Sequence, residues 1–100
     1  MIAKIIIKRR FLPGKTSEIL TLLNNMRTGA MDRPGYISGE TLMQHNDPQC
    51  LIVICTWQSM QDWLVWKEDN RRKQFELMLE VYQEGPTVYE EYVLGTPLHQ

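Results

Sequence analysis

The chain has 100 residues and a mass of 11.8 kDa, which is enough for one domain with a single core. Hydrophobic residues make up 43% and charged residues 23%, close to the averages for globular domains, so disorder, collagen-like repeats and coiled coils are excluded. The net charge of -1 gives no positive field to attract nucleic acid, and the longest apolar runs are far shorter than the roughly 20 residues of a membrane span.

Residues 2–11 predict a first strand, because their side chains fall into two alternating sets. One set, on one face, consists of Ala3, Ile5, Ile7, Arg9 and Phe11. The charges follow the apolar residues, and no small-residue cleavage site comes after them, which is unlike a secretory signal peptide. We therefore expect a cytoplasmic protein whose first element is a strand.

A helix and a second strand are expected next. A Pro-Gly pair ends the first strand, and hydroxyl side chains then supply a helix start. The predicted helix covers residues 15–29, with Gly29 at its end. Residues 36–45 predict a second strand, and residues 46–48 predict the turn that follows it.

Residues 50–57 predict a third strand, which is apolar on both faces. Cys50 and Cys55 lie five residues apart in this strand, so their side chains point to opposite faces and cannot form a disulfide within it. No histidine lies within four residues of either cysteine. The sequence therefore predicts two core thiols and no metal site.

One further helical region and one further strand complete the prediction. Residues 59–82 predict a single helical region, which Ser59 caps and a Gly-Pro pair ends. Residues 87–94 predict the last strand. We expect one domain over residues 1–95, followed by a short C-terminal tail over residues 96–100.

The predicted order is β-α-β-β-α-β, the split βαβ or ferredoxin-like order of an α+β fold. In that fold the helices cover one face of a four-stranded antiparallel sheet. Since they cannot also cover the other face, the apolar second face of residues 50–57 needs a different cover. The sequence therefore predicts a homodimer in which a second copy of the chain packs against this face.

Few residues are candidates for acid-base chemistry. The sequence contains no glycine-rich phosphate loop, no His-x-x-x-His pair and no Gly-x-Ser-x-Gly elbow. Of its two histidines, His99 falls in the predicted tail, so His45 beside the predicted turn is the candidate acid or base. The alternative is that His45 is a solvated structural residue.

Three tryptophans, Trp57, Trp63 and Trp66, fall within ten residues of one another. Trp63 and Trp66 share one side of the predicted helix with Asn70. The tryptophans either fill the core between sheet and helices or wall a pocket for a flat aromatic or quinone-like ligand. Trp63 could instead face solvent or the partner subunit.

Basic residues occur at two places. Arg9 shares its strand face with Ile5 and Ile7, so its guanidinium is expected at the rim of such a pocket, where it could hold a ligand oxyanion. The alternative is an ion pair between Arg9 and the acids at residues 90–91. The basic run at residues 70–73 is followed by glutamates and predicts a solvated helix face without a site.

Several segments together resemble the antibiotic biosynthesis monooxygenase family. They are residues 34–42 (PGYISGETL), residues 47–48, residues 53–59 (VICTWQS) and the pattern Asp62-Trp63-x-x-Trp66. The resemblance extends over roughly residues 5–94. Members of this family are small dimeric α+β barrels with a ferredoxin-like protomer, so the resemblance implies the same fold and a homodimer.

The family includes cofactor-independent oxygenases of polyketide and quinol substrates, haem-degrading oxygenases and isomerases of small metabolites. The haem-degrading members rely on an Asn, a Trp and a His, where this chain has Ile7, Trp66 and Glu76, so the resemblance argues against haem degradation. The cofactor-independent oxygenases use a Trp at the position of Trp66 together with polar side chains. The local candidates for those side chains are Arg9, Tyr36, His45 and Asn70.

The leading hypothesis is an oxygenase that oxidises a small aromatic, phenolic or quinol substrate with O2, without metal, flavin or haem. The expected catalytic residues are Trp66, Arg9 and His45, and the expected substrate-binding residues are Trp57, Ile7, Tyr36 and Asn70. Arg9 or His45 would stabilise the phenolate or take its proton. The alternatives are a non-catalytic dimeric ligand-binding protein and an isomerase of a small oxygenated metabolite.

Overall fold

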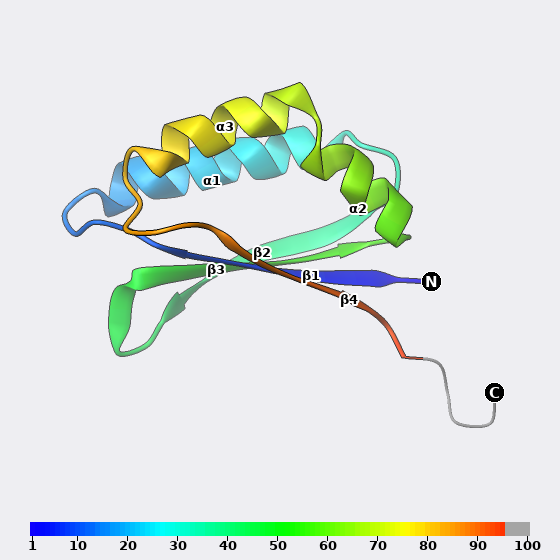
Figure 1. Ribbon diagram of the computed structural model, residues 1–100, viewed down its shortest axis with the longest axis horizontal. Coiled ribbons are helices and arrows are strands. Elements are labelled where there is room, and N and C mark those ends of the chain that lie inside the picture. The colour runs from blue at the N-terminus through cyan, green and yellow to red at the C-terminus, as the bar shows by residue number, and fades with distance from the viewer. Residues whose placement is uncertain (96–100) are drawn as a thin grey trace.

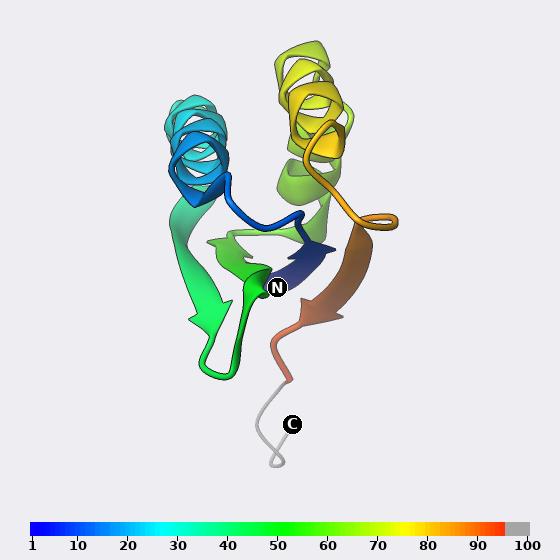
Figure 2. The same cartoon turned by 90° about the vertical axis from the view of Figure 1, so that its left-hand side faces the viewer.

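Four strands form one antiparallel sheet in the order β2-β3-β1-β4, and the helices cover only one of its faces (Figures 1 and 2). The structure is a computed structural model that describes residues 1–95, so the predicted tail with His99 lies outside the described residues. The elements are β1 (Ala3–Arg10), α1 (Thr16–Met31), β2 (Tyr36–Gln44), β3 (Asp47–Trp57), α2 (Met60–Lys67), α3 (Asn70–Glu80) and β4 (Val88–Val93). The predicted ferredoxin-like α+β fold is confirmed.

β1 lies in the middle of the sheet, between β3 and β4. Its residues alternate between the two faces as predicted: Ala3, Ile5 and Ile7 are buried toward the helices, and Lys4 and Lys8 on the other face are exposed. Arg9 belongs to the buried set, so the strand carries its guanidinium into the core instead of into water.

α1 runs past the predicted end at Gly29 and continues to Met31, so that boundary is wrong. Gly29 lies inside the helix and faces the core. A Cβ atom at this position would lie 3.0 Å from Cη2 of Trp66. The glycine therefore lets α1 approach the tryptophan closely, and its role is packing and not helix termination.

The hairpin between β2 and β3 is tighter than predicted. β3 begins at Asp47, which already pairs with Gln44 across the sheet, so the turn consists of His45 and Asn46. The predicted turn at residues 46–48 is wrong because pairing resumes one residue after Asn46. This makes β3 an 11-residue strand and leaves His45 at the tip of the hairpin.

The predicted single helical region is in fact two helices, α2 and α3, which point in different directions (Figure 1). Ser59 caps α2 as predicted, by accepting a hydrogen bond from the backbone N–H of Asp62 at 3.1 Å. Asp69 starts α3 in the same way, by accepting from the backbone N–H of Arg71 at 2.8 Å. A second cap inside one apolar pattern is what divides the region.

The other face of the sheet carries no helix (Figure 2). The half-buried side chains of Ile6, Ile52 and Ile54 lie in its centre, and Cys50 lies on this face while Cys55 is buried on the helix face. The second copy expected to cover this face remains a prediction. No helix within residues 1–95 is long and apolar enough to cross a membrane.

Candidate active site

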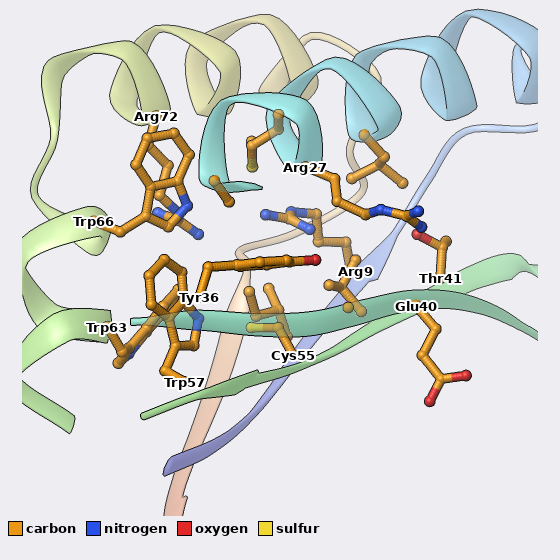
Figure 3. Close-up of a pocket in the computed structure, with 16 residues that line it drawn as sticks. Arg9, Arg27, Tyr36, Glu40, Thr41, Cys55, Trp57, Trp63, Trp66 and Arg72 are labelled. Atoms are coloured by element: carbon orange, nitrogen blue, oxygen red, sulfur yellow. The ribbon is translucent and has the colours of Figure 1, made fainter. Parts of the chain in front are cut away.

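A pocket lies between the sheet and the helices, next to the edge strand β2 (Figure 3). Most of its lining is apolar and comes from α1 and the three neighbouring strands, with Ile7 of β1, Leu23 and Met26 of α1 and Val53 of β3 among the lining residues. The cavity volume is about 50 Å³, which is room for a few water molecules. An aromatic ligand therefore requires side chains of the lining to move.

Aromatic rings form one end of the pocket. Trp57, Trp63 and Trp66 are all buried, and the ring of Tyr36 meets that of Trp57 edge-on at a centroid distance of 5.4 Å. The indole N–H of Trp63 donates to Glu91 at 2.6 Å, so Trp63 faces β4 and neither of the two alternative directions considered for it. These rings present flat apolar surfaces that suit a planar ligand.

A bulge at the start of β2 brings Tyr36 and Gly39 to the same face of the sheet. The register shifts by one residue between Tyr36 and Ser38, so both Tyr36 and Gly39 line the pocket. A Cβ atom at Gly39 would lie 2.8 Å from the Tyr36 hydroxyl, so only a glycine leaves that hydroxyl its space. Burial raises the pKa of Tyr36, and the nearby Arg27 opposes this only in part. The phenol is thus protonated at neutral pH and can donate a hydrogen bond.

A buried charge cluster forms the wall between the pocket and α3. Arg9 and Arg72 are only 3% and 2% exposed, and both donate to the same oxygen, Oε1 of Glu76. Arg72 also donates to the hydroxyl of Tyr89 at 2.9 Å. The predicted alternative, an ion pair between Arg9 and residues 90–91, is wrong, because Glu76 is the acid that Arg9 binds.

Besides Arg27 of α1, the sequence interpretation missed Arg72 as a residue of the site. Its basic run was expected to be a solvated helix face, which is wrong for Arg72, although the residues on either side of it are exposed. Arg72 precedes Glu76 by four residues and the fully buried Leu79 by seven, which places all three on one side of α3. That spacing is the signal that could have identified it.

Two buried donors in the pocket wall, Nε of Arg9 and Nε1 of Trp57, have no hydrogen-bond partner within residues 1–95. Beside them lies the thiol of Cys55, whose pKa is raised by burial, against the opposing effects of the Trp57 N–H and of Arg72 and Arg9. The thiol is therefore protonated at neutral pH. The polar residues of the pocket wall are thus mainly hydrogen-bond donors, and few of its groups could accept a proton.

Five of the seven expected site residues come together in this pocket: Arg9, Trp66, Trp57, Ile7 and Tyr36. His45 and Asn70 do not: both are exposed, His45 at the tip of the β2–β3 hairpin and Asn70 at the start of α3. The individual roles of all seven stay predictions. Glu76, which the resemblance places where the haem-degrading members have a histidine, is bonded to two arginines. Within residues 1–95, no three His, Cys, Asp or Glu side chains gather as a metal site.

One family model matches the chain, and similar solved structures share its fold. The model of the family described as antibiotic biosynthesis monooxygenase matches residues 2–76. No curated protein sequence matches the chain.

Similar solved structures include a conserved protein from Methanosarcina mazei Go1 (TM-score 0.85, 15% identity, covering 92% of this chain and 91% of that one). Rv0793 from Mycobacterium tuberculosis is similar at TM-score 0.84 and 12% identity, covering 98% of this chain and 99% of that one. SnoaB, a cofactor-independent oxygenase from Streptomyces nogalater, is similar at TM-score 0.81 and 10% identity, covering 100% of both chains. At these identities the likenesses show the fold alone.

Proposed function

The chain belongs to the antibiotic biosynthesis monooxygenase family, and we propose that it is a cofactor-independent monooxygenase of a small aromatic, phenolic or quinol substrate. The observation that carries this proposal is the pocket itself. Trp57 and Trp66 wall an apolar space in which Arg9 and the Tyr36 hydroxyl supply donors for a substrate oxygen. A ring bound there is shielded from water and held by its π-faces.

The proposed reaction replaces a ring hydrogen ortho or para to a phenolic oxygen by an oxygen atom from O2. One oxygen atom becomes the new quinone carbonyl. The other leaves as water, together with the ring hydrogen and the phenolic hydrogen. The substrate supplies all four electrons that O2 accepts, so the balance requires no external reductant.

The chain's own residues act mainly through binding and electrostatics. The guanidinium of Arg9 is always protonated, so it stabilises a phenolate but cannot remove the proton that creates it. Tyr36 is protonated at neutral pH because burial raises its pKa, so it too acts as a donor. The pocket therefore favours substrates whose hydroxyl group is acidic enough to lose its proton to water before it is enclosed.

Oxygen uptake by the purified protein tests the proposal. Hydroquinones and polycyclic phenols are supplied in turn, with protein-free samples as the control for autoxidation. The Trp66→Ala variant should lose uptake, and Trp66→Phe should keep part of it because a ring remains. Circular dichroism shows whether each variant is folded. Full uptake by folded Trp66→Ala would contradict the proposal.

A non-catalytic ligand-binding protein is the second candidate function. Two observations favour a binding role. Burial raises the pKa of Tyr36 and of Cys55, so both are protonated at neutral pH. No histidine within residues 1–95 lines the pocket, since His45 lies at the tip of the β2–β3 hairpin. An isomerase needs a base, so the same observation argues against that alternative. Quenching of tryptophan fluorescence by a ligand without oxygen uptake would favour the binding protein.

We also propose that two copies associate through the sheet face that no helix covers. Ile6, Ile52 and Ile54 lie in the centre of this face, with the exposed Leu42 and Tyr92 around them. An apolar surface of this kind, flanked by lysines, is typical of a subunit interface.

A further inference from the structure

We propose that the pocket binds an aromatic ligand that carries a carboxylate, and that Arg9 and Arg72 hold this carboxylate. The inference rests on the proposed function in one respect, namely that this pocket is the substrate site. It goes further by naming the substrate class and by assigning a role to Arg72.

The first support is a charge imbalance in the pocket wall. Arg9 and Arg72 are almost fully buried, yet within residues 1–95 Glu76 is the one acid within ion-pair distance of either. Both arginines donate to the same carboxylate oxygen. Two buried positive charges therefore share one negative charge, and a buried charge without a full counter-charge is costly.

Glu76 itself is less buried than the arginines that it joins. Its side chain is 14% exposed and borders a polar groove between α3 and β4. Water in this groove screens the carboxylate and weakens its attraction for the arginines. Arg72 lines both this groove and the pocket, whereas Arg9 lines the pocket, so the positive charge that Glu76 leaves unbalanced faces the apolar pocket mainly through Arg9.

The second support is an unused donor. Nε of Arg9 is buried and has no hydrogen-bond partner within residues 1–95. Arg72 uses a single nitrogen, Nη2, for its bonds to both Glu76 and Tyr89. Guanidinium groups with donors to spare are suited to a carboxylate, which can accept several hydrogen bonds at once.

A third guanidinium adds to the excess. Arg27 of α1 lines the same pocket near Thr41, and within residues 1–95 it forms no ion pair (Figure 3). Glu40 also borders the pocket, but its side chain points away from the helices (Figure 3). Three arginines therefore line the cavity, the buried Arg9 and Arg72 and the exposed Arg27, against Glu76 behind the two buried arginines and Glu40 at the border, whose side chain points away.

The arginines lie where a ring substituent would reach them. The guanidinium of Arg72 is 5.2 Å from the ring of Trp63, and Arg9 lines the pocket together with the ring of Tyr36 (Figure 3). A flat ligand stacked among these rings would place its edge near both guanidiniums. Ring binding and carboxylate binding are thus compatible in one pose.

Two matched probes test the proposal: 1,4-dihydroxy-2-naphthoate and 1,4-dihydroxynaphthalene, which share the ring and both hydroxyls but differ in the carboxylate. Their binding is followed under nitrogen by quenching of tryptophan fluorescence, with N-acetyltryptophanamide as the optical control. We expect the naphthoate to bind at least about tenfold more tightly, and this preference to shrink as sodium chloride is added. Equal affinities would overturn the proposal without any variant being made.

Variants then assign the effect to residues. Arg72→Gln should weaken binding of the naphthoate by about tenfold or more and leave the diol unchanged. Glu76→Gln should strengthen binding of the naphthoate, because it removes the competing carboxylate. Lys73→Gln, at an exposed neighbour on the same helix, is the control and should change neither. If Arg72→Gln weakens both probes equally, Arg72 has only a structural role and its assignment fails.

Oxygen uptake separates this inference from the proposed function. If the naphthoate binds tightly but no oxygen is consumed with either probe, the carboxylate subsite stands and the monooxygenase proposal fails. If the diol is bound as tightly and oxidised as fast as the naphthoate, the monooxygenase proposal stands and the subsite fails.

Discussion

Two neighbouring basic side chains of β1 point to opposite faces of the sheet and differ in burial. Arg9 points toward the helices, is 3% exposed and bonds to Glu76 inside the core. Lys8, one residue earlier, points to the uncovered face and forms a 3.4 Å ion pair with Glu90, and both side chains reach water. The side chains carry the same charge and lie on the same strand, so the difference lies in their surroundings.

This difference matters for both stability and function. An exposed ion pair contributes little, because water solvates both charges well and ordering two side chains costs entropy. A buried pair cannot lose one partner without leaving a charge that water no longer solvates. The helix face of the sheet is thus where charge can act on a ligand, and the other face is where apolar area can join a second copy.

The largest expected effect comes from removing the glutamate that pairs with a basic side chain of β1 on each face: Glu76 on the helix face and Glu90 on the uncovered face. Glu76→Ala should lower the free energy of unfolding by about 3–5 kcal/mol, because it leaves Arg9 and Arg72 buried without a counter-charge. Glu90→Ala should lower it by less than about 1 kcal/mol. Urea denaturation measures both. Similar losses in the two variants would mean that burial does not distinguish the faces.

A charge placed on the uncovered face tests the association proposed for it. Ile54→Glu puts a carboxylate in the centre of that face, and we expect it to weaken association by about a hundredfold or more. Light scattering after size exclusion should change from the mass of a dimer to that of a monomer. Thr87→Glu, in the loop before β4, is the control and should leave the mass unchanged. A native protein that is already monomeric would refute the association.

The sequence was enough to place Arg9 but not its partner. Alternation along β1 fixed the side of the sheet on which Arg9 lies, because the period of a strand is set by local geometry. Glu76 lies 67 residues away in the chain, and no local pattern joins two residues at that separation. The burial of Arg72 could have been predicted from its spacing to Leu79, but the run of basic residues around it indicated an exposed helix face.

The division between α2 and α3 could not be read from hydrophobic spacing either. The apolar residues keep a helical period across the break at Glu68 and Asp69, since both helices pack on the same sheet face. The bulge in β2 is similar, because a single unpaired residue changes which side chains share a face without changing the composition. The pairing of β2 with β3 determines which residue is left unpaired and therefore which side chains share a face.

The two faces of β2 allow a smaller comparison at the bulge. Gly39→Ala would place a Cβ atom 2.8 Å from the Tyr36 hydroxyl, so we expect the hydroxyl to be displaced and the protein to lose about 1–3 kcal/mol of stability. Ligand affinity, measured by fluorescence quenching, should fall as well. Ser38→Ala, at the exposed neighbouring residue, is the control and should change neither. Unaltered binding by Gly39→Ala would show that the position of Tyr36 does not matter.

The smallest expected effect concerns Glu91 of β4, which lies at the margin of the helix face. Lys67 and the indole N–H of Trp63 both bond to its carboxylate and hold its pKa below the ordinary value of 4.5. A carboxyl group whose pKa is lower in the folded than in the unfolded chain stabilises the fold above the unfolded pKa and loses that contribution as pH falls toward the folded value. The difference in unfolding free energy between the native protein and Glu91→Gln should therefore be constant near neutral pH and shrink below about pH 4.5. Because Glu91 is partly exposed, water limits the size of this difference, and it should stay well below that for Glu76. A difference that does not vary between pH 7 and pH 3 would show that the bonds to Lys67 and Trp63 do not depend on the charge of the carboxylate.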